Sequence, residues 1–231
     1  MFYLNPQYLI FMAPALIVML AAQWYVRSTY NKWGRVPTTS RITGEQATRR
    51  LKDTGGLYDV QVRQISGELS DHYDPRKKVL SLSHGVYQGS SVASVAIAAH
   101  ELGHALQDKE SYFPLRLRSM LVPAVNIGST LGWILIMVGL LINALGIAWL
   151  GVFAFSGGAV FALATLPVEL NASARAKQLL RKSGIIQNEK EQKGVNSVLN
   201  AAALTYVAAL FTAVMQLLYF VSLVSGGSRR R

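Results

Sequence analysis

The chain has 231 residues, 23 Lys and Arg against 12 Asp and Glu, and a formal net charge of +11. Hydrophobic residues make up 51% of the chain and charged residues only 15%, against roughly 25% in ordinary globular proteins, which argues against one large soluble domain. The chain contains no cysteine, which excludes disulfide bonds and thiolate metal sites.

Charged residues are absent from residues 1–26, 119–168 and 199–228. A run of about 20 apolar residues is long enough to cross a bilayer. The sequence therefore predicts four transmembrane helices, with a tight reversal near Asn143 to Gly146 in the longest apolar run, and two soluble segments. The expected spans are residues 8–26, 122–142, 147–167 and 201–224, and the soluble segments are residues 27–118 and 169–198.

The basic residues are concentrated in the two soluble segments. Residues 27–118 hold 14 of them, residues 169–198 hold six, and the last three residues hold three. Four spans place both segments on one side of the membrane, and the positive-inside rule makes that side cytoplasmic in a plasma or inner membrane. The charge then reflects topology, and we expect no nucleic-acid partner, because no nucleic-acid-binding motif is present. The Arg229–Arg231 tail would lie outside, against this bias.

The first soluble segment opens with a helix signal. Thr43 and Gln46 form a capping-box pattern, and Gly55-Gly56 ends a helix that we expect to run to about Asp53. Alternation over residues 59–65 predicts a strand, and residues 69–74 and 78–82 predict two more. Peptidases often hold an extended substrate beside such an edge strand. A plain scaffold is the alternative reading of these strands.

The next helix contains the pattern His-Glu-x-x-His, formed by His100, Glu101 and His104. Residues four apart lie on one face of a helix, so both imidazoles can bind one Zn²⁺. Glu101 is then placed to act as general base toward a zinc-bound water. The surrounding helix is almost uncharged, with Ser90 or Ser91 as its N-cap, so these polar residues have little structural reason to be there.

A catalytic zinc needs about three protein ligands. Glu169 is the best candidate for the third, because it follows Pro167 where the third span ends and stands among apolar neighbours at the start of an expected helix over residues 169–184. A charge that favours the helix N-terminus is the alternative. Glu189 and Glu191 are expected in an exposed, polar stretch.

His72 is the second choice for the third ligand. Its place on an expected edge strand favours, together with Tyr73, contact with the substrate or an oxyanion, and a structural role is an alternative. His84 is expected in a turn. Asp71 or Asp74 could orient a zinc-binding histidine through a hydrogen bond.

Several short segments spread over nearly the whole chain carry a family resemblance: Asn5-Pro6 and residues 56–60, 71–75, 99–105, 114–119, 166–169 and 201–209. Through them the chain resembles the bacterial membrane-bound neutral zinc metallopeptidases called YugP-like, which are similar to the HtpX-like and Ste24-like membrane proteases. In those proteases a glutamate on a later helix completes the zinc site, and the resemblance assigns that role to Glu169. YugP-like chains typically carry Asp two residues later, where this chain has Asn171, so a carboxylate role there is lost.

We therefore expect a mainly α membrane protein with four transmembrane helices and a cytoplasmic α+β zincin-like part, forming one peptidase domain over residues 1–231. The expected function is a zinc endopeptidase that acts on proteins in or near the membrane. The alternative is a non-catalytic scaffold with a structural zinc site. A transporter is not expected, because no span carries an ionisable residue. Gly128-x-x-x-Gly132 could pack helices within the chain or form an oligomer.

Overall fold

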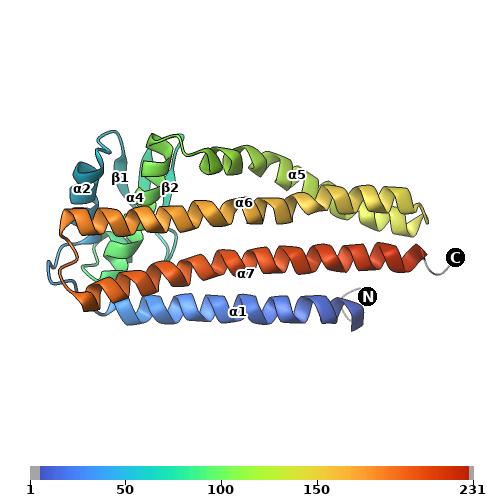
Figure 1. Ribbon diagram of the computed structural model, residues 1–231, viewed down its shortest axis with the longest axis horizontal. Coiled ribbons are helices and arrows are strands. Elements are labelled where there is room, and N and C mark those ends of the chain that lie inside the picture. Colours follow the sequence, from blue (N-terminus) through green and yellow to red (C-terminus); the bar gives the residue numbers. More distant parts are fainter. Residues whose placement is uncertain (1–5, 229–231) are drawn as a thin grey trace. The chain divides into compact units, whose positions relative to one another are not determined.

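The computed structural model describes residues 6–228, and helices dominate that range. Figure 1 shows the elements from the N-terminus in blue to the C-terminus in red. The mainly helical architecture with a small sheet is confirmed. The elements are α1 (Pro6–Gly34), α2 (Gly44–Gly55), β1 (Gln61–Ile65), β2 (His72–Asp74), β3 (Val79–Ser83), α3 (His84–Tyr87), α4 (Val92–Lys109), α5 (Phe113–Leu141), α6 (Leu145–Ser183) and α7 (Glu189–Ser228).

Four helices within residues 6–228 are long and apolar enough to cross a membrane, as the sequence predicted. They are α1, α5, α6 and α7, and each continues beyond the expected span. Asn143, in the turn between α5 and α6, has a positive φ of 56°. This left-handed conformation is one that Asn tolerates better than most residues, and it reverses the chain where the sequence predicted a tight turn.

The chain divides into two compact units. Unit 1 consists of residues 1–22, 116–167 and 205–231, and unit 2 consists of residues 23–115 and 168–204. The apolar stretches thus fall mainly in unit 1, and the two polar segments fall in unit 2. Each unit is built from pieces that are distant in the sequence.

In unit 1, α5 and α6 approach closely through small residues. A Cβ added to Gly132 would lie 2.8 Å from the carbonyl oxygen of Gly151, and one added to Gly139 would lie 2.4 Å from the backbone nitrogen of Ala148. Only glycine allows backbones this close. The Gly128-x-x-x-Gly132 face is therefore used for packing within the chain.

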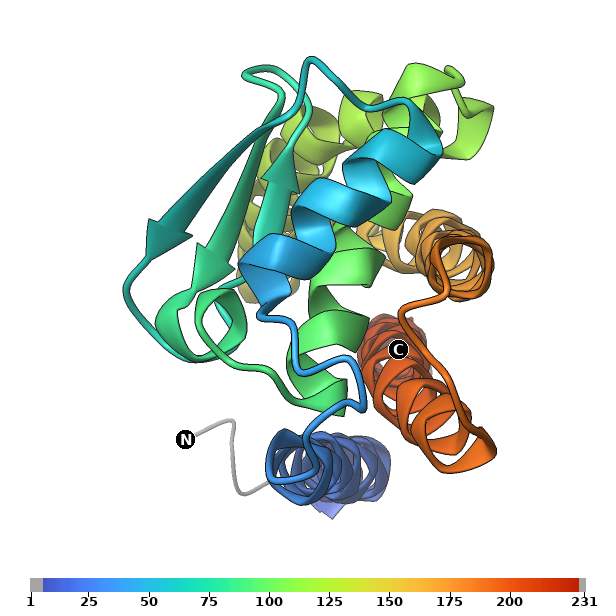
Figure 2. The same ribbon diagram turned by 90° about the vertical axis from the view of Figure 1, so that its left-hand side faces the viewer.

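Unit 2 contains the sheet, in the order β1-β3-β2. β1 is parallel to the central β3, and β2 is antiparallel to it. Figure 2 shows α2 and α4 packed together on one side of this sheet. Leu80 and Leu82 of β3 and Leu51 of α2 have no exposed surface, in a core shared with α4. The sheet and α2 thereby support α4, the helix that carries the histidine pair.

The strand bounds differ from the expected ones mainly at β2. The sequence predicted a strand from residue 69, but the strand begins at His72. Leu69 has a φ of 52° and Gly67 a φ of 99°, and neither value is compatible with an extended strand. The chain turns here before pairing with β3. His84, expected in a turn, instead begins the short helix α3.

Local helix signals were read correctly. Thr43 and Gln46 form the complete capping box of α2, and Gly56 ends that helix with a φ of 63°, a conformation that favours glycine. Ser91 caps α4, because its side chain accepts a hydrogen bond from the backbone N–H of Ser94. These caps fix where the two helices of unit 2 begin.

Two expectations about the second polar segment were wrong. Glu169 does not begin a helix, because α6 continues unbroken through Pro167 to Ser183. The stretch before Val198 is helical, because α7 already begins at Glu189; Glu189 is exposed as expected, but Glu191 is not. Glu191 is 3% exposed and accepts hydrogen bonds from the backbone and hydroxyl of Thr39. Burial of Val195 and Leu199 explains why this polar-looking stretch packs as a helix.

Candidate metal centre

Helix α4 presents His100 and His104 on one face, four residues apart. The imidazole rings lie edge to face, with ring centres 4.9 Å apart. The third member of the group, Glu169, comes from α6 and is 1% exposed. The ligand atoms of these three residues lie within 4.8 Å of one another. The structure thus brings together the three residues that the sequence proposed as metal ligands.

The spacing within the cluster suits a tetrahedral ion. The Nε2 atoms of His100 and His104 each lie 3.3 Å from the same oxygen, Oε2 of Glu169. Ligands held at about 2.0–2.1 Å from a tetrahedral zinc are separated from one another by roughly 3.3 Å. Two imidazole nitrogens and one carboxylate oxygen are also the donor set of known catalytic zinc sites. The residues present therefore fit a zinc ion.

The other ring nitrogen of each histidine, Nδ1, also has a polar partner. Nδ1 of His100 lies 3.2 Å from the hydroxyl of Ser173, and Nδ1 of His104 lies 3.0 Å from Oε1 of Gln107. Ser173 stands one turn after Glu169 on α6, and Gln107 stands one turn after His104 on α4. Such contacts orient a metal-binding imidazole, and here they leave both Nε2 atoms facing Glu169.

Glu169 and His104 shift each other's pKa values. Burial favours the neutral carboxyl of Glu169, but hydrogen bonds from His100 and His104 outweigh it and hold the pKa of Glu169 well below its usual range. Burial also disfavours the charged form of His104, yet Glu169 and Glu101 outweigh it and raise the pKa of His104. The site thus stabilises the ionised carboxylate of Glu169, the form that can bind a cation, and a cation would replace the proton of His104.

Glu101 differs from Glu169 in its surroundings. Burial raises the pKa of the Glu101 carboxyl, against the opposing effect of the two histidines. Glu101 makes no hydrogen bond or ion pair with any residue from 6 to 228. Its side chain is therefore available to exchange a proton with another molecule, and a raised pKa suits a group that must both accept and release one.

The other candidate residues have different partners. Tyr73 points toward α4, and its hydroxyl donates to Asp108 over 2.9 Å. His72, on the opposite face of β2, is exposed and contacts the carbonyl of Ser70. Neither belongs to the cluster.

Asp71 and Asp74 do not orient the histidines. Asp71 accepts hydrogen bonds from the backbone and hydroxyl of Ser83, and Asp74 accepts from the backbone of Arg76 and Lys77 in the following turn. Both carboxylates therefore stabilise the loops around β2 and β3. The residues that contact the imidazoles are Gln107 and Ser173, which the sequence reasoning missed.

A signal for Gln107 and Ser173 was present in the sequence. Gln107 lies three positions after His104, and Ser173 lies four positions after Glu169, so each shares a helix face with a cluster residue. Gln107 is fully buried although it is polar. A polar residue one turn from a metal ligand on an apolar helix is thus a candidate for orienting that ligand.

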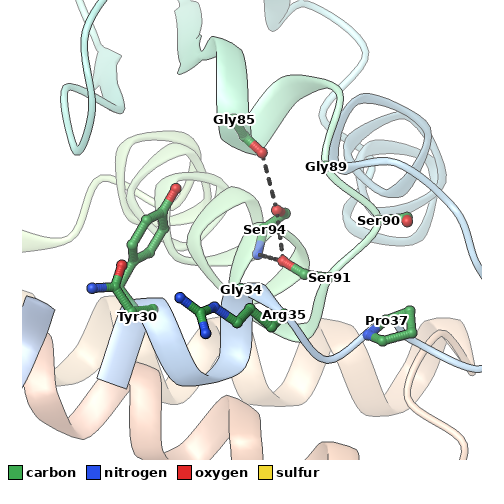
Figure 3. Close-up of a pocket in the computed structure, with 10 residues that line it drawn as sticks. Tyr30, Gly34, Arg35, Pro37, Gly85, Gly89, Ser90, Ser91 and Ser94 are labelled. Carbon is green, nitrogen blue, oxygen red and sulfur yellow. Dashed lines mark hydrogen bonds between the residues drawn. The ribbon is translucent and has the colours of Figure 1, made fainter. Parts of the chain in front are cut away.

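A separate cavity of about 340 Å³ lies at the start of α4. Figure 3 shows its lining, with Ser91 and Ser94 at the helix start and Arg35 beside them. The hydroxyl of Ser94 donates to the carbonyl of Gly85, and the hydroxyl of Ser91 caps the helix. No cluster residue lines this cavity.

Comparison with known proteins identifies a family and a relative. The family model described as "Putative neutral zinc metallopeptidase" matches residues 8–225. The chain is 46% identical over 206 residues to "Putative membrane protease YugP" of Bacillus subtilis (strain 168), and the match covers 89% of this chain and 91% of the relative. No solved structure matches the chain. The relative's name and the four apolar helices together indicate a membrane protein.

Proposed function

Because the chain belongs to the family described as "Putative neutral zinc metallopeptidase", we propose that it is a membrane-integral zinc endopeptidase. The observation that carries the proposal is the cluster of His100, His104 and Glu169, with Glu101 next to the first histidine. A structural zinc site has no use for a partnerless carboxylate at this position. A peptidase uses one as its general base.

The residues of the cluster have distinct roles in this proposal. His100, His104 and Glu169 hold Zn²⁺, which supplies Lewis-acid chemistry by polarising the scissile carbonyl and acidifying water. Glu101 accepts a proton from the attacking water and delivers it to the leaving amine. Ser173 and Gln107 keep the imidazoles oriented. A zincin-like arrangement of this kind needs no covalent intermediate.

We propose proteins in or near the membrane as substrates. The four apolar helices are long enough to cross a bilayer, and in such a protein a bond to be cut must come close to the membrane. β2 lies at an edge of the sheet and contacts α4, and an extended peptide can add to such an edge through backbone hydrogen bonds. His72, exposed on β2, is a candidate contact for that peptide.

We further propose that unit 2 faces the cytoplasm of a plasma or inner membrane. The support is the basic residues of unit 2, of which 12 lie in residues 23–115 and six in residues 168–204. The Arg229–Arg231 tail, which counts against this topology, lies outside the described residues.

The reaction can be tested with detergent-purified wild type, Glu101→Gln, Glu169→Ala and the exposed-surface control Glu68→Ala. We expect one zinc per chain in wild type, Glu101→Gln and Glu68→Ala, and casein cleavage only by wild type and Glu68→Ala. Glu169→Ala should lose both zinc and cleavage. Wild-type zinc affinity in Glu169→Ala would remove Glu169 from the ligand set. Cleavage by Glu101→Gln at the wild-type rate would exclude the general base.

The topology can be tested by cysteine labelling, because the natural chain has no cysteine. Glu68→Cys places a thiol in unit 2, and Gly146→Cys places one at the start of α6, where a Cβ meets no atom within 4 Å. A membrane-impermeant maleimide should label Gly146→Cys in intact cells and Glu68→Cys only after permeabilisation. The reverse pattern would place unit 2 outside the cell.

A further inference from the structure

A chain of hydrogen bonds leads from Arg175 on α6 to His104 on α4. Nε of Arg175 donates to Oδ1 of Asn171 over 2.6 Å. The same oxygen accepts from Nε2 of Gln107 over 3.0 Å, and Oε1 of Gln107 lies 3.0 Å from Nδ1 of His104. Each residue in the chain therefore contacts the next within ordinary hydrogen-bond distance.

The direction of these bonds is fixed by chemistry. A guanidinium can only donate, so the Asn171 atom that it meets must be the carbonyl oxygen. That oxygen can only accept, so Gln107 must present its amide nitrogen to it. The same nitrogen also donates to the backbone carbonyl of Val168 over 2.7 Å, a second oxygen that can only accept. The amide of Gln107 therefore has only one possible orientation.

The fixed orientation of Gln107 determines which ring nitrogen of His104 carries a hydrogen. With its nitrogen facing Asn171 and Val168, Gln107 turns its oxygen to Nδ1 of the imidazole, so Nδ1 must carry the hydrogen. Nε2, which lies 3.3 Å from Oε2 of Glu169, is then the nitrogen that binds a metal once the ion displaces its proton. Gln107 has no exposed surface, so water cannot compete for its donors or its acceptor.

The chain also attaches the two ligand-bearing helices to each other. Val168 directly precedes Glu169 in the sequence, so the bond from Gln107 to its carbonyl ties α4 to the backbone beside the third ligand. The position of the hydrogen on His100 is not fixed in the same way, because the hydroxyl of Ser173 beside its Nδ1 can either donate or accept. The directional constraint therefore acts at His104 alone.

We propose that Arg175, Asn171 and Gln107 are positioning residues that keep the hydrogen of His104 on Nδ1 and so leave Nε2 as its metal-binding nitrogen. The proposal rests on the proposed function, since it takes His104 as a zinc ligand. Loss of contacts that orient a ligand typically weakens metal affinity about 10- to 100-fold. A break in the chain should therefore weaken zinc binding without removing any ligand.

Asn171 offers a matched pair of variants. Asn171→Asp keeps an acceptor for both Gln107 and Arg175, so the direction of the chain is unchanged. Asn171→Leu has similar size but no acceptor, so only the Val168 carbonyl still holds the orientation of Gln107 and that orientation is weakened. We expect Asn171→Asp to bind zinc nearly as tightly as wild type and Asn171→Leu about 10- to 100-fold more weakly. Affinity would be measured by competition with a chromophoric chelator in detergent.

Two more variants guard against a folding defect in Asn171→Leu. Gln107→Leu has similar size but offers Nδ1 of His104 no acceptor, so we expect weakened zinc affinity. Glu110→Gln removes only the outer partner of Arg175 and should leave affinity unchanged. Thermal unfolding of each metal-free variant shows whether it is folded.

A spectroscopic readout reports the bond itself. In the zinc-loaded protein the Nδ1–H proton of His104 should give a downfield NMR signal that is protected from exchange in wild type and Asn171→Asp and lost in Asn171→Leu. Wild-type affinity with an unchanged signal in Asn171→Leu would overturn the proposal. So would equal losses of affinity in Asn171→Asp and Asn171→Leu. A wild type that binds zinc and shows the signal but cleaves nothing would refute the peptidase and leave this proposal intact.

Discussion

Gly103 lies directly against the backbone of Ala172. A Cβ built at position 103 would sit 2.3 Å from the Ala172 carbonyl oxygen and 3.1 Å from its Cα. Gly103 lies between Glu101 and His104 on α4, and Ala172 stands one turn after Glu169 on α6. The two helices can therefore approach closely enough to share one metal site only because residue 103 has no side chain.

Gly103→Ala should consequently disturb both packing and metal binding. The added methyl must push α4 away from α6, and overpacking of this kind costs about 1–3 kcal/mol of unfolding free energy. It also separates His100 and His104 from Glu169, so zinc affinity should fall. Gly34→Ala is the control, because a Cβ there meets no atom within 4 Å. Equal stability and zinc affinity in the two variants would contradict the steric argument.

Glu191 should stabilise unit 2 through its ionised form. Burial favours its neutral form, but hydrogen bonds from Thr39, Gln187 and Asn188 outweigh it and lower the pKa of Glu191 below 4.5. A lowered folded pKa means that the stabilisation is fully present above about pH 4.5 and is lost as the pH falls through the folded pKa.

Glu191→Gln should therefore destabilise the protein near neutral pH. The amide turns an N–H toward groups that only donate, such as the Gln187 backbone, and such a mismatch costs about 1–3 kcal/mol. Denaturant unfolding of both proteins between pH 3 and 7 would measure the difference, which should shrink toward pH 3. A difference that stays constant over this range would show that the carboxylate charge contributes nothing.

Substitutions can distinguish the role of Tyr73 from that of His72. Tyr73→Phe removes the hydroxyl that donates to Asp108 on α4 and should cost about 0.5–1.5 kcal/mol of unfolding free energy. His72→Ala removes an exposed side chain and should leave stability nearly unchanged. If His72 contacts the substrate, His72→Ala raises KM for a peptide substrate, whereas unchanged kinetics would exclude that contact.

Removal of metal should lower the stability of the wild type. An ion that binds only the folded protein adds RT ln(1 + [L]/Kd), which is about 2.7 kcal/mol at a free concentration of 100 times Kd. The Tm of wild type should thus rise with free zinc in a buffered series. The Tm of Glu169→Ala should respond only at much higher zinc. Identical zinc dependence in the two proteins would place the ion elsewhere.

Features that depend on local sequence were predicted well. The spans follow from the absence of charge over residues 119–168 and 199–228, because every charge inside a bilayer is costly. The caps at Thr43 and Ser91 follow from short-range hydrogen bonds. The pair of His100 and His104 follows from the helical period alone.

Features that depend on tertiary contacts were not predictable in the same way. Glu191 is a charged residue of a type that usually lies at the surface. Only its hydrogen bonds with Thr39, which is distant in the sequence, make its burial favourable. Pro167 signals a helix end, because it has no backbone N–H to donate, yet α6 passes through it. Gln107 is polar but uncharged. The sequence does not show that its side-chain nitrogen donates hydrogen bonds to Val168 and Asn171 on another helix.

The division of unit 2 into residues 23–115 and 168–204 has a consequence for the order of synthesis. A ribosome makes His100 and His104 well before Glu169, with α5 and most of the apolar part of α6 in between. The proposed zinc site therefore cannot be complete until that apolar hairpin and Glu169 after it have been translated. A nascent chain that stalls within the hairpin carries two of the three proposed ligands. In the proposed peptidase, the order of the chain thus delays the hydrolytic centre until nearly all of its apolar hairpin has been made.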